Sequence, residues 1–247
     1  MPTAIVSVFA EQGFVVAADG RDFDLEKQVV VSDSVQKIYQ ATYPHGPLAY
    51  AFSGTDKITP RGSSETLFDY VSEAMKAATV LKNHNCRSLW HYADSVRAAL
   101  WPLPEAVVAA LGTYDSPPQP FIVFIAGYHN GRPKRAHITF FHDGQEPEVS
   151  SDQLGNGNLY GAFPREMPRI VEDLADDAPL AAYRTKLNGI ETMDEAIAAT
   201  QKFIAALKDP VALTLDSRCV GIGGHVHVCK VTFADGFQWI IKPLLIR

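Results

Sequence analysis

Residues 3–21, TAIVSVFAEQGFVVAADGR, contain the pattern that decides the fold. The run from Thr3 to Ala10 is apolar and rich in β-branched residues, and the run from Phe14 to Asp19 repeats that character after the turn EQG. Two such runs separated by a short turn predict a pair of strands. Thr3 at the start of the first strand is then either an ordinary strand residue or a nucleophile that acts near the N-terminus.

The composition predicts one globular domain over residues 1–247. The chain is 47% hydrophobic and 20% charged, which suits a sizeable core. Its length fits one large domain or two small ones. We see no linker-like change in composition and no internal repeat, so the single domain is preferred.

Charge and hydropathy exclude several classes of protein. The net charge of -6 argues against a general binder of nucleic acid or of anionic membranes. No apolar run reaches the roughly 18–20 residues of a membrane span, and no secretory signal is visible. Three scattered cysteines (Cys86, Cys219, Cys229) do not suggest a disulfide framework. The sequence therefore predicts a cytoplasmic protein.

The order of the remaining elements predicts an α+β fold. Period-2 and apolar runs indicate further strands at 29–41, 46–54, 120–128, 134–144, 225–233 and 237–246. Helical spacing indicates helices at 67–81, 89–100, 164–175 and 193–207. The last begins with a capping box, Thr192 with Glu195. Locally paired strand blocks with helices between them suggest a four-layer αββα sandwich, with a two-layer α+β domain as the alternative.

The N-terminal quarter resembles the proteasome β-subunit family of the N-terminal nucleophile (Ntn) hydrolases. Thr3 begins TAIVSV, the turn EQG follows, and VVAADGR ends in Asp19 and Arg21 in the manner of the family's "AAD-x-R". SVQKIYQ supplies Lys37 followed by the apolar Ile38 and the aromatic Tyr39, about two residues later than is usual in the family. LAYAFSG resembles the family's "AFAG" strand, whose glycine region lines the substrate site, and here it ends in Ser53 and Gly54.

This resemblance implies roles for individual residues. Thr3 would be the nucleophile, Lys37 its electrostatic activator and Asp19 the partner of that lysine. A threonine hydroxyl needs a base, and a free N-terminal amine, with a pKa of about 8, can serve. Backbone N–H groups near Gly54 would stabilise the oxyanion. Ser53 and Arg21 would line the substrate site.

The sequence departs from the family pattern in three places. Met1 and Pro2 precede Thr3, so its amine is free only after their removal, and ordinary removal of Met1 would stop at Pro2. The family's Gly-Ser-Gly-like turn, whose serine supports that amine, is matched best by Gly155, Asn156 and Gly157, with an amide in place of the hydroxyl.

The third departure precedes the penultimate strand. Alignment on Gly223-Gly224 puts Ile222 where the family has a Ser and Cys219 where it has an Asp. Asp216 and Ser217 lie three residues upstream, and they substitute only if the loop shifts. The network that supports the amine is altered at this point.

The same residues have ordinary structural explanations. A first-strand Thr is usually a β-former, an Asp at a strand end is usually a turn former, and a Lys is usually solvated. His225 and His227 alternate on one strand face as two metal ligands would, but no third ligand accompanies them in a recognisable pattern. We therefore predict neither a metal nor another cofactor.

The sequence is compatible with two functions. The first is a threonine-type peptidase or amidohydrolase that acts through Thr3 after removal of Met1-Pro2, on a peptide or protein substrate, within a homo-oligomeric ring. An ATPase partner is compatible with it, but the sequence does not identify one. The alternative is a non-catalytic ring-forming protein that keeps the fold as a structural or binding element.

Overall fold

The computed structural model describes residues 3–11, 13–24, 27–115, 118–151, 154–172 and 178–244. Contacts divide the chain into two units, residues 1–39 with 154–247, and residues 40–153. Each unit holds one five-stranded antiparallel sheet and its own helices. The mixed α/β class with antiparallel sheets is therefore observed, while the four-layer arrangement and the single domain stay predictions.

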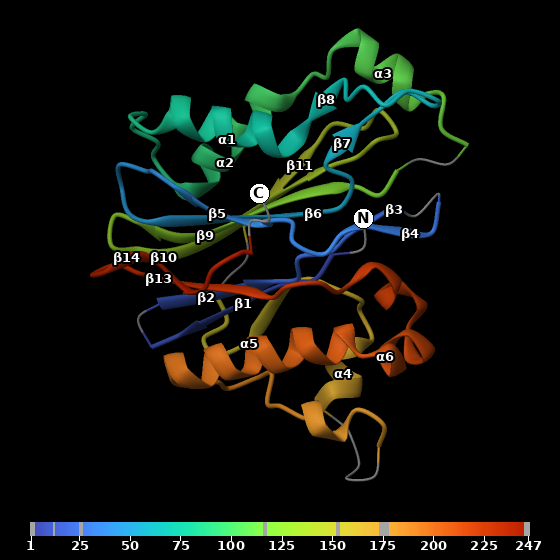
Figure 1. Cartoon of the computed structure of the whole chain (residues 1–247). Coiled ribbons are helices and arrows are strands. Elements are labelled where there is room, and N and C mark those ends of the chain that lie inside the picture. Colours follow the sequence, from blue (N-terminus) through green and yellow to red (C-terminus); the bar gives the residue numbers. More distant parts are fainter. Residues whose placement is uncertain are drawn as a thin grey trace. The chain divides into compact units, whose positions relative to one another are not determined.

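The sheet of the first unit is built around the N-terminal hairpin (Figure 1). Its strand order is β12-β1-β2-β13-β14. The bounds are β1 (Ile5–Ala10), β2 (Gly13–Ala18), β12 (Leu159–Ala162), β13 (His227–Thr232) and β14 (Gly236–Ile241). The side chains of β2 are buried throughout, in keeping with the unbroken apolar run GFVVAA. The predicted first pair of strands is thus at the centre of this sheet.

Helix α5 (Met193–Lys208) covers one face of that sheet, below β1 and β2 in Figure 1. Alternate residues of β1, including Val6 and Val8, share one core with Phe203 and Leu207 of α5. The predicted capping box is present, because the Thr192 side chain and the Glu195 side chain each accept a backbone N–H of the other. The prediction for this helix is confirmed.

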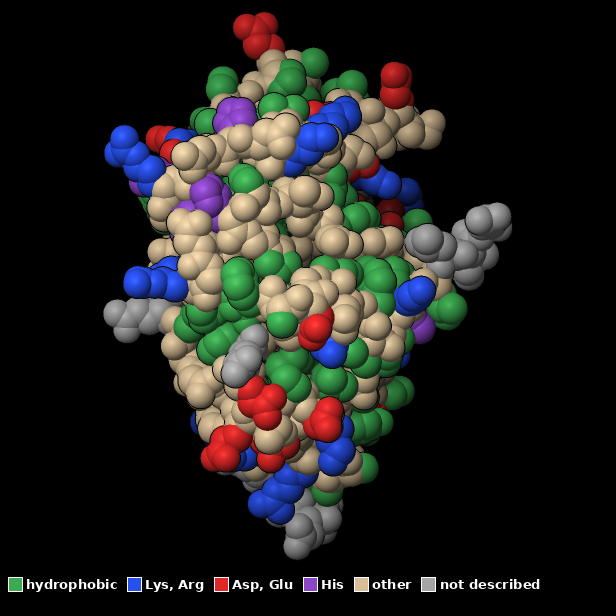
Figure 2. Space-filling view, turned by 90° about the vertical axis from the view of Figure 1, so that its left-hand side faces the viewer, with side chains coloured by type: hydrophobic (Ala, Val, Ile, Leu, Met, Phe, Trp, Pro, Cys, Tyr) green, Lys and Arg blue, Asp and Glu red, His purple; other side chains and the backbone are tan. Residues whose placement is uncertain are grey.

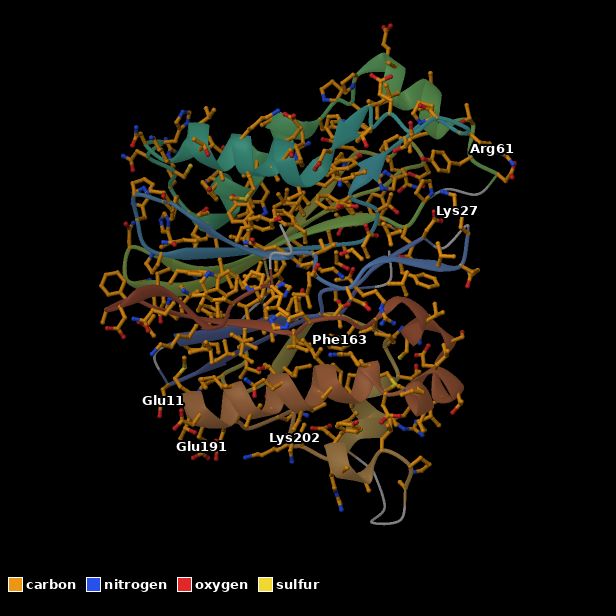
Figure 3. All side chains as sticks on the ribbon, viewed as in Figure 1. Glu11, Lys27, Arg61, Phe163, Glu191 and Lys202 are labelled. Atoms are coloured by element: carbon orange, nitrogen blue, oxygen red, sulfur yellow. The ribbon has the colours of Figure 1, made fainter. Side chains whose placement is uncertain are left out.

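The smaller elements of the first unit lie before and after α5. They are β3 (Asp22–Asp24), β4 (Val29–Ser32), α4 (Met167–Glu172), η1 (Ala181–Tyr183), α6 (Pro210–Leu215) and η2 (Ser217–Gly221). The helix predicted at 164–175 corresponds to α4, and its residues 173–175 lie outside the described residues. Phe163, labelled in Figure 3, follows β12 and packs edge-on against Phe203, with ring centroids 5.1 Å apart.

The second unit contains the sheet β11-β10-β9-β6-β5. Its strands are β5 (Ile38–Ala41), which crosses the unit boundary, β6 (Leu48–Ser53), β9 (Phe121–His129), β10 (Arg132–Phe140) and β11 (Glu148–Ser150). Asn130 and Gly131 join β9 to β10 with φ of 51° and 73°, the left-handed pair of a tight hairpin. A short hairpin of β7 (Lys57–Ile58) and β8 (Phe68–Asp69) precedes the helices.

Three helices complete the second unit: α1 (Tyr70–Leu81), α2 (Leu89–Leu100) and α3 (Glu105–Leu111). Helix α2 packs on β9 and β10, and α1 packs on α2. The helices predicted at 67–81 and 89–100 are therefore confirmed, with the first beginning three residues later. Helix α3 was not predicted.

The strand predicted over 29–41 is wrong in one respect. It is interrupted between β4 and β5, where residues 33–37 form no strand. The backbone of this segment bonds elsewhere: Val35 N–H donates to the Gly20 carbonyl, and the Asp33 carbonyl accepts from His225 N–H, both at 2.8 Å. Long-range contacts, rather than strand propensity, decide the conformation of these five residues.

Charges are mixed on the surface. Acidic and basic side chains lie close together on the face drawn in Figure 2, in agreement with the modest net charge of -6. None of the helices among the described residues is long and apolar enough to cross a bilayer.

Candidate active site

The candidate site lies in the first unit, where the start of β1, the end of β2 and the segment before β5 meet. The Lys37 ammonium is at the centre. Its Nζ donates to Thr3 Oγ1 at 3.1 Å, to Asp19 Oδ1 at 3.1 Å and to the Arg21 carbonyl at 2.6 Å. All three donor positions of the ammonium are thereby satisfied. The structure thus brings the predicted residues Thr3, Asp19 and Lys37 together.

The same site is almost completely closed to solvent. Thr3 is 6% exposed, Lys37 4% and Asp19 not at all. A buried ion pair persists only where its remaining hydrogen-bonding positions are also filled. The stability of the Lys37–Asp19 pair therefore depends on the backbone groups that hydrogen-bond to it.

Asp19 accepts four hydrogen bonds. Its Oδ1 takes the Lys37 ammonium and the Ala4 N–H at 2.9 Å. Its Oδ2 takes the N–H groups of Arg21 at 3.2 Å and Gly223 at 3.0 Å. The carboxylate thus connects the end of β2 to the start of β1 and to the loop before β13. Such a carboxylate acts as a structural centre as well as the partner of a lysine.

Three glycines allow these segments to approach so closely. A Cβ on Gly224, at φ +69°, would lie 2.4 Å from the Asp33 carbonyl oxygen. A Cβ on Gly20 would lie 2.6 Å from the His225 carbonyl oxygen, and one on Gly223 would overlap the Arg21 guanidinium. The site therefore requires glycine at both Gly223 and Gly224, because a side chain at either position would clash with a neighbouring segment.

Arg21 contributes its carbonyl to Lys37, while its side chain turns to Asp33. The guanidinium donates to both carboxylate oxygens of Asp33, at 2.6 Å and 3.3 Å. Asp33 is half exposed, so this ion pair is of the surface kind. The predicted substrate-lining role of the Arg21 side chain remains a prediction.

His227 is the functional candidate that the sequence interpretation did not use. Its Nε2 accepts the Lys37 backbone N–H at 3.0 Å, and the residue is fully buried on β13. Burial above all, then the nearby charges of Lys37 and His225, lower the pKa of His227 to about 3. The alternating pattern HVHV had suggested only a weak metal site. Among the described residues, no three His, Cys, Asp or Glu side chains gather as a metal would require.

The Gly155–Gly157 turn does not reach Thr3. Gly157 N–H donates to the Phe9 carbonyl at 2.7 Å, and β12 then runs antiparallel to β1 until Ala162 pairs with Ile5. The turn therefore lies beside the end of β1 that is remote from Thr3. Asn156 is placed there with it, so the structure does not bring this predicted supporting group into the site.

Two further sets of predicted residues have contacts of their own. Ser53 ends β6 in the second unit and Gly54 follows it, and a Cβ on Gly54, at φ +90°, would overlap the Pro120 carbonyl. Asp216, the suggested substitute acid, caps η2 and pairs with Arg218 at 2.8 Å. Met1 and Pro2, on whose removal the predicted mechanism depends, lie outside the described residues.

Comparison with known proteins supports the fold. The chain is similar to the Gly-1 mutant of Anbu from Hyphomicrobium sp. strain MC1, with a TM-score of 0.53 and 12% identity over 97% of this chain and 87% of that chain. Anbu is proteasome-like. No family model and no curated protein matches the sequence. The likeness at this identity shows the fold alone, and that fold is proteasome-like.

Proposed function

We propose that this protein is a threonine-type amidohydrolase or peptidase of the N-terminal nucleophile kind, acting through Thr3 once Met1 and Pro2 are removed. One observation carries the proposal: the Lys37 ammonium, held by Asp19, donates directly to the Thr3 hydroxyl oxygen. A hydroxyl that accepts from a cation is more easily deprotonated, because the alkoxide formed is stabilised by the adjacent positive charge.

The direction of that hydrogen bond defines what else the reaction needs. In the ammonium form Lys37 is the donor, so the proton of the Thr3 hydroxyl must leave toward another base. A free α-amine on Thr3 has a suitable pKa, about 8 in model compounds, whereas an amide nitrogen after Pro2 has no basicity. Exposure of the Thr3 amine is therefore the condition for activity.

The substrate class follows from the chemistry rather than from a pocket. Acyl transfer to a threonine hydroxyl suits the carbonyl carbon of a peptide or protein amide, and the backbone near Gly54, with Ser53 beside it, would serve the oxyanion. We extend the proposal to a four-layer αββα single domain and to a cytoplasmic homo-oligomeric ring that confines the peptidase. An ATPase partner would be needed if the substrates are folded proteins.

A specific observation also favours the non-catalytic alternative. The four donors to Asp19 are the Lys37 ammonium and three backbone N–H groups, and none of them is an N-terminal amine. The network is thus complete whether or not the chain has been processed. A protein of this fold can keep Asp19 and Lys37 for structure alone.

N-terminal sequencing of the native protein separates the two functions. Thr3 as the first residue supports the hydrolase, and Met1 or Pro2 as the first residue in every preparation contradicts it. A variant that lacks Pro2 provides a matched form, because loss of the initiator methionine then exposes Thr3 directly.

Two electrophiles test the chemistry on both forms. A β-lactone acylates the hydroxyl, whereas an epoxyketone closes a ring on the hydroxyl and the free amine together. We expect both to label the processed protein and neither to label Thr3→Ala. Equal labelling of Thr3→Ala would exclude Thr3 as the nucleophile.

A further inference from the structure

Lys37 is held both through its side chain and through its backbone, and only the side chain takes part in the ion pair with Asp19. Its ammonium lies among Thr3, Asp19 and the Arg21 carbonyl, but its backbone lies in the irregular segment 33–37. The Lys37 N–H donates to Nε2 of His227 at 3.0 Å. This side chain comes from a strand 190 residues further along the chain.

The strand register places His227 beside the ion pair. His227 pairs with Ala18, the residue before Asp19, in the β13–β2 ladder. Four residues earlier on the same loop, Gly223 donates its N–H to Asp19. One short segment, residues 223–227, therefore contacts the carboxylate through its backbone and the lysine through an imidazole.

We infer that His227 is a positioning residue: by accepting the Lys37 N–H it fixes the main chain from which the Lys37 ammonium reaches Thr3. This inference rests on the proposed function for its effect on turnover, but not for the contact itself. Such positioning affects the rate, because displacement of a catalytic group by about 1 Å can cost roughly 100-fold.

The protonation state of His227 suits this role. A ring nitrogen accepts a hydrogen bond only when it carries no proton, so the neutral ring holds its proton on Nδ1. Nδ1 has no hydrogen-bond partner among the described residues. Because burial and the charges of Lys37 and His225 disfavour the imidazolium, Nε2 stays an acceptor at neutral and mildly acidic pH.

A packing role is the competing explanation. The His227 ring lies edge-on to Trp239, with centroids 6.3 Å apart, and a buried ring of this kind fills space whatever its nitrogens do. Two substitutions separate packing from acceptance. His227→Phe keeps an aromatic ring and loses the acceptor, whereas His227→Gln loses the ring and keeps an acceptor at the Nε2 distance from the backbone.

The first measurement is amide hydrogen exchange, which needs no activity. We expect the Lys37 amide to be protected in the wild-type protein, exposed to exchange in His227→Phe and at least partly protected again in His227→Gln. Val35 is the control within the same segment, because its N–H donates to the Gly20 carbonyl and not to His227. Its protection must persist in both variants, which shows that the segment has not unfolded.

The second measurement is turnover of a peptide amide by the processed protein. We expect kcat of His227→Phe to fall roughly 10- to 100-fold with KM nearly unchanged, and His227→Gln to recover to within about threefold of wild type. Continued protection of Lys37 in His227→Phe, or its loss with wild-type kcat, would overturn the inference. If the processed wild-type protein has no activity, the proposed function fails, and the exchange measurement alone decides whether His227 holds Lys37.

Discussion

The Lys37 ammonium lies 3.1 Å from the Thr3 hydroxyl oxygen and donates to it. Asp19 and the Arg21 carbonyl hold the ammonium in this position, so the loss of either partner would weaken its hold beside the hydroxyl. The proposed activity and the local structure therefore depend on the same few contacts.

Replacing the cation tests its chemical part. We expect Lys37→Met to slow β-lactone acylation of the processed protein by roughly 100- to 1,000-fold, because the charge that stabilises the Thr3 alkoxide is gone. Lys37→Arg should not restore the rate, since the planar guanidinium does not fit three convergent acceptors. Mass spectrometry of the time course measures both. Acylation of Lys37→Met within about threefold of wild type would contradict an activating role.

Asp19→Asn tests the structural part. The substitution removes the negative charge and turns an NH₂ group toward existing donors, leaving the buried ammonium unpaired. We expect the free energy of unfolding, measured in urea, to fall by about 3–5 kcal/mol. The control is Asp33→Asn, which breaks a half-exposed pair with Arg21 and should cost no more than about 1 kcal/mol. Equal losses in the two variants would show that Asp19 is not the centre of a buried network.

Gly224 and Gly236 have nearly the same backbone conformation, with φ of +69° and +73°. Nothing lies within 4 Å of a Cβ on Gly236, whereas a Cβ on Gly224 meets the Asp33 carbonyl at 2.4 Å. Gly236→Ala should therefore cost only the strain of a left-handed alanine, about 1–2 kcal/mol. Gly224→Ala should cost about 1–3 kcal/mol more, as overpacking does. Denaturation midpoints compare them, and identical values would mean that the junction yields freely.

The buried His227 predicts a loss of stability in mild acid. Its pKa is about 3 in the folded protein and about 6.5 when unfolded, so below pH 6.5 the unfolded state binds a proton that the folded state does not. The stability that the folded state gains from a neutral His227 is therefore complete above about pH 6.5, and it is lost as the pH falls toward 3. Between pH 7 and pH 5 we expect wild type to lose about 2 kcal/mol more than His227→Gln. Parallel losses in urea titrations at the two pH values would argue against a buried neutral imidazole.

The capping box predicts the effect of a surface change. Thr192→Ala removes the acceptor for Glu195 N–H at the start of α5, and we expect a loss of about 1 kcal/mol. Thr214→Ala is the control: its hydroxyl donates to the Val211 carbonyl in α6 and caps nothing, so the change should stay within about 0.5 kcal/mol. Thermal unfolding measures both. A neutral Thr192→Ala would mean that α5 is held by packing alone.

Local chemistry made much of the fold predictable. The β-branched runs on either side of EQG are β1 and β2, and the spacing of apolar residues located α1, α2 and α5 within a few residues. Helix α3 was missed because seven residues between Pro104 and Gly112 are too short for a helical period to show. The break at residues 33–37 was missed because its partners, Gly20 and the 225–227 segment, lie far away in the sequence.

The candidate site divides in the same way. The ordered positions of Thr3, Asp19 and Lys37 identified a group of residues that the structure brings within hydrogen-bonding distance. The Gly155–Gly157 turn was assigned to the site by its resemblance to the family's Gly-Ser-Gly-like turn, but the antiparallel register of β12 on β1 places it at the other end of the strand. Register depends on which residues pair across the sheet, and a short local match does not contain that information.

The four hydrogen bonds accepted by Asp19 bear on how relatives of this chain should be compared. A relative without catalytic activity would still be selected to keep this carboxylate and its lysine, because the loss of either residue leaves buried polar groups without hydrogen-bond partners. Retention of the two residues among homologues therefore measures constraint on folding. The residues before the threonine are under no such constraint once catalysis is lost. Their variation among homologues is therefore the better indicator of whether a given member is still a hydrolase.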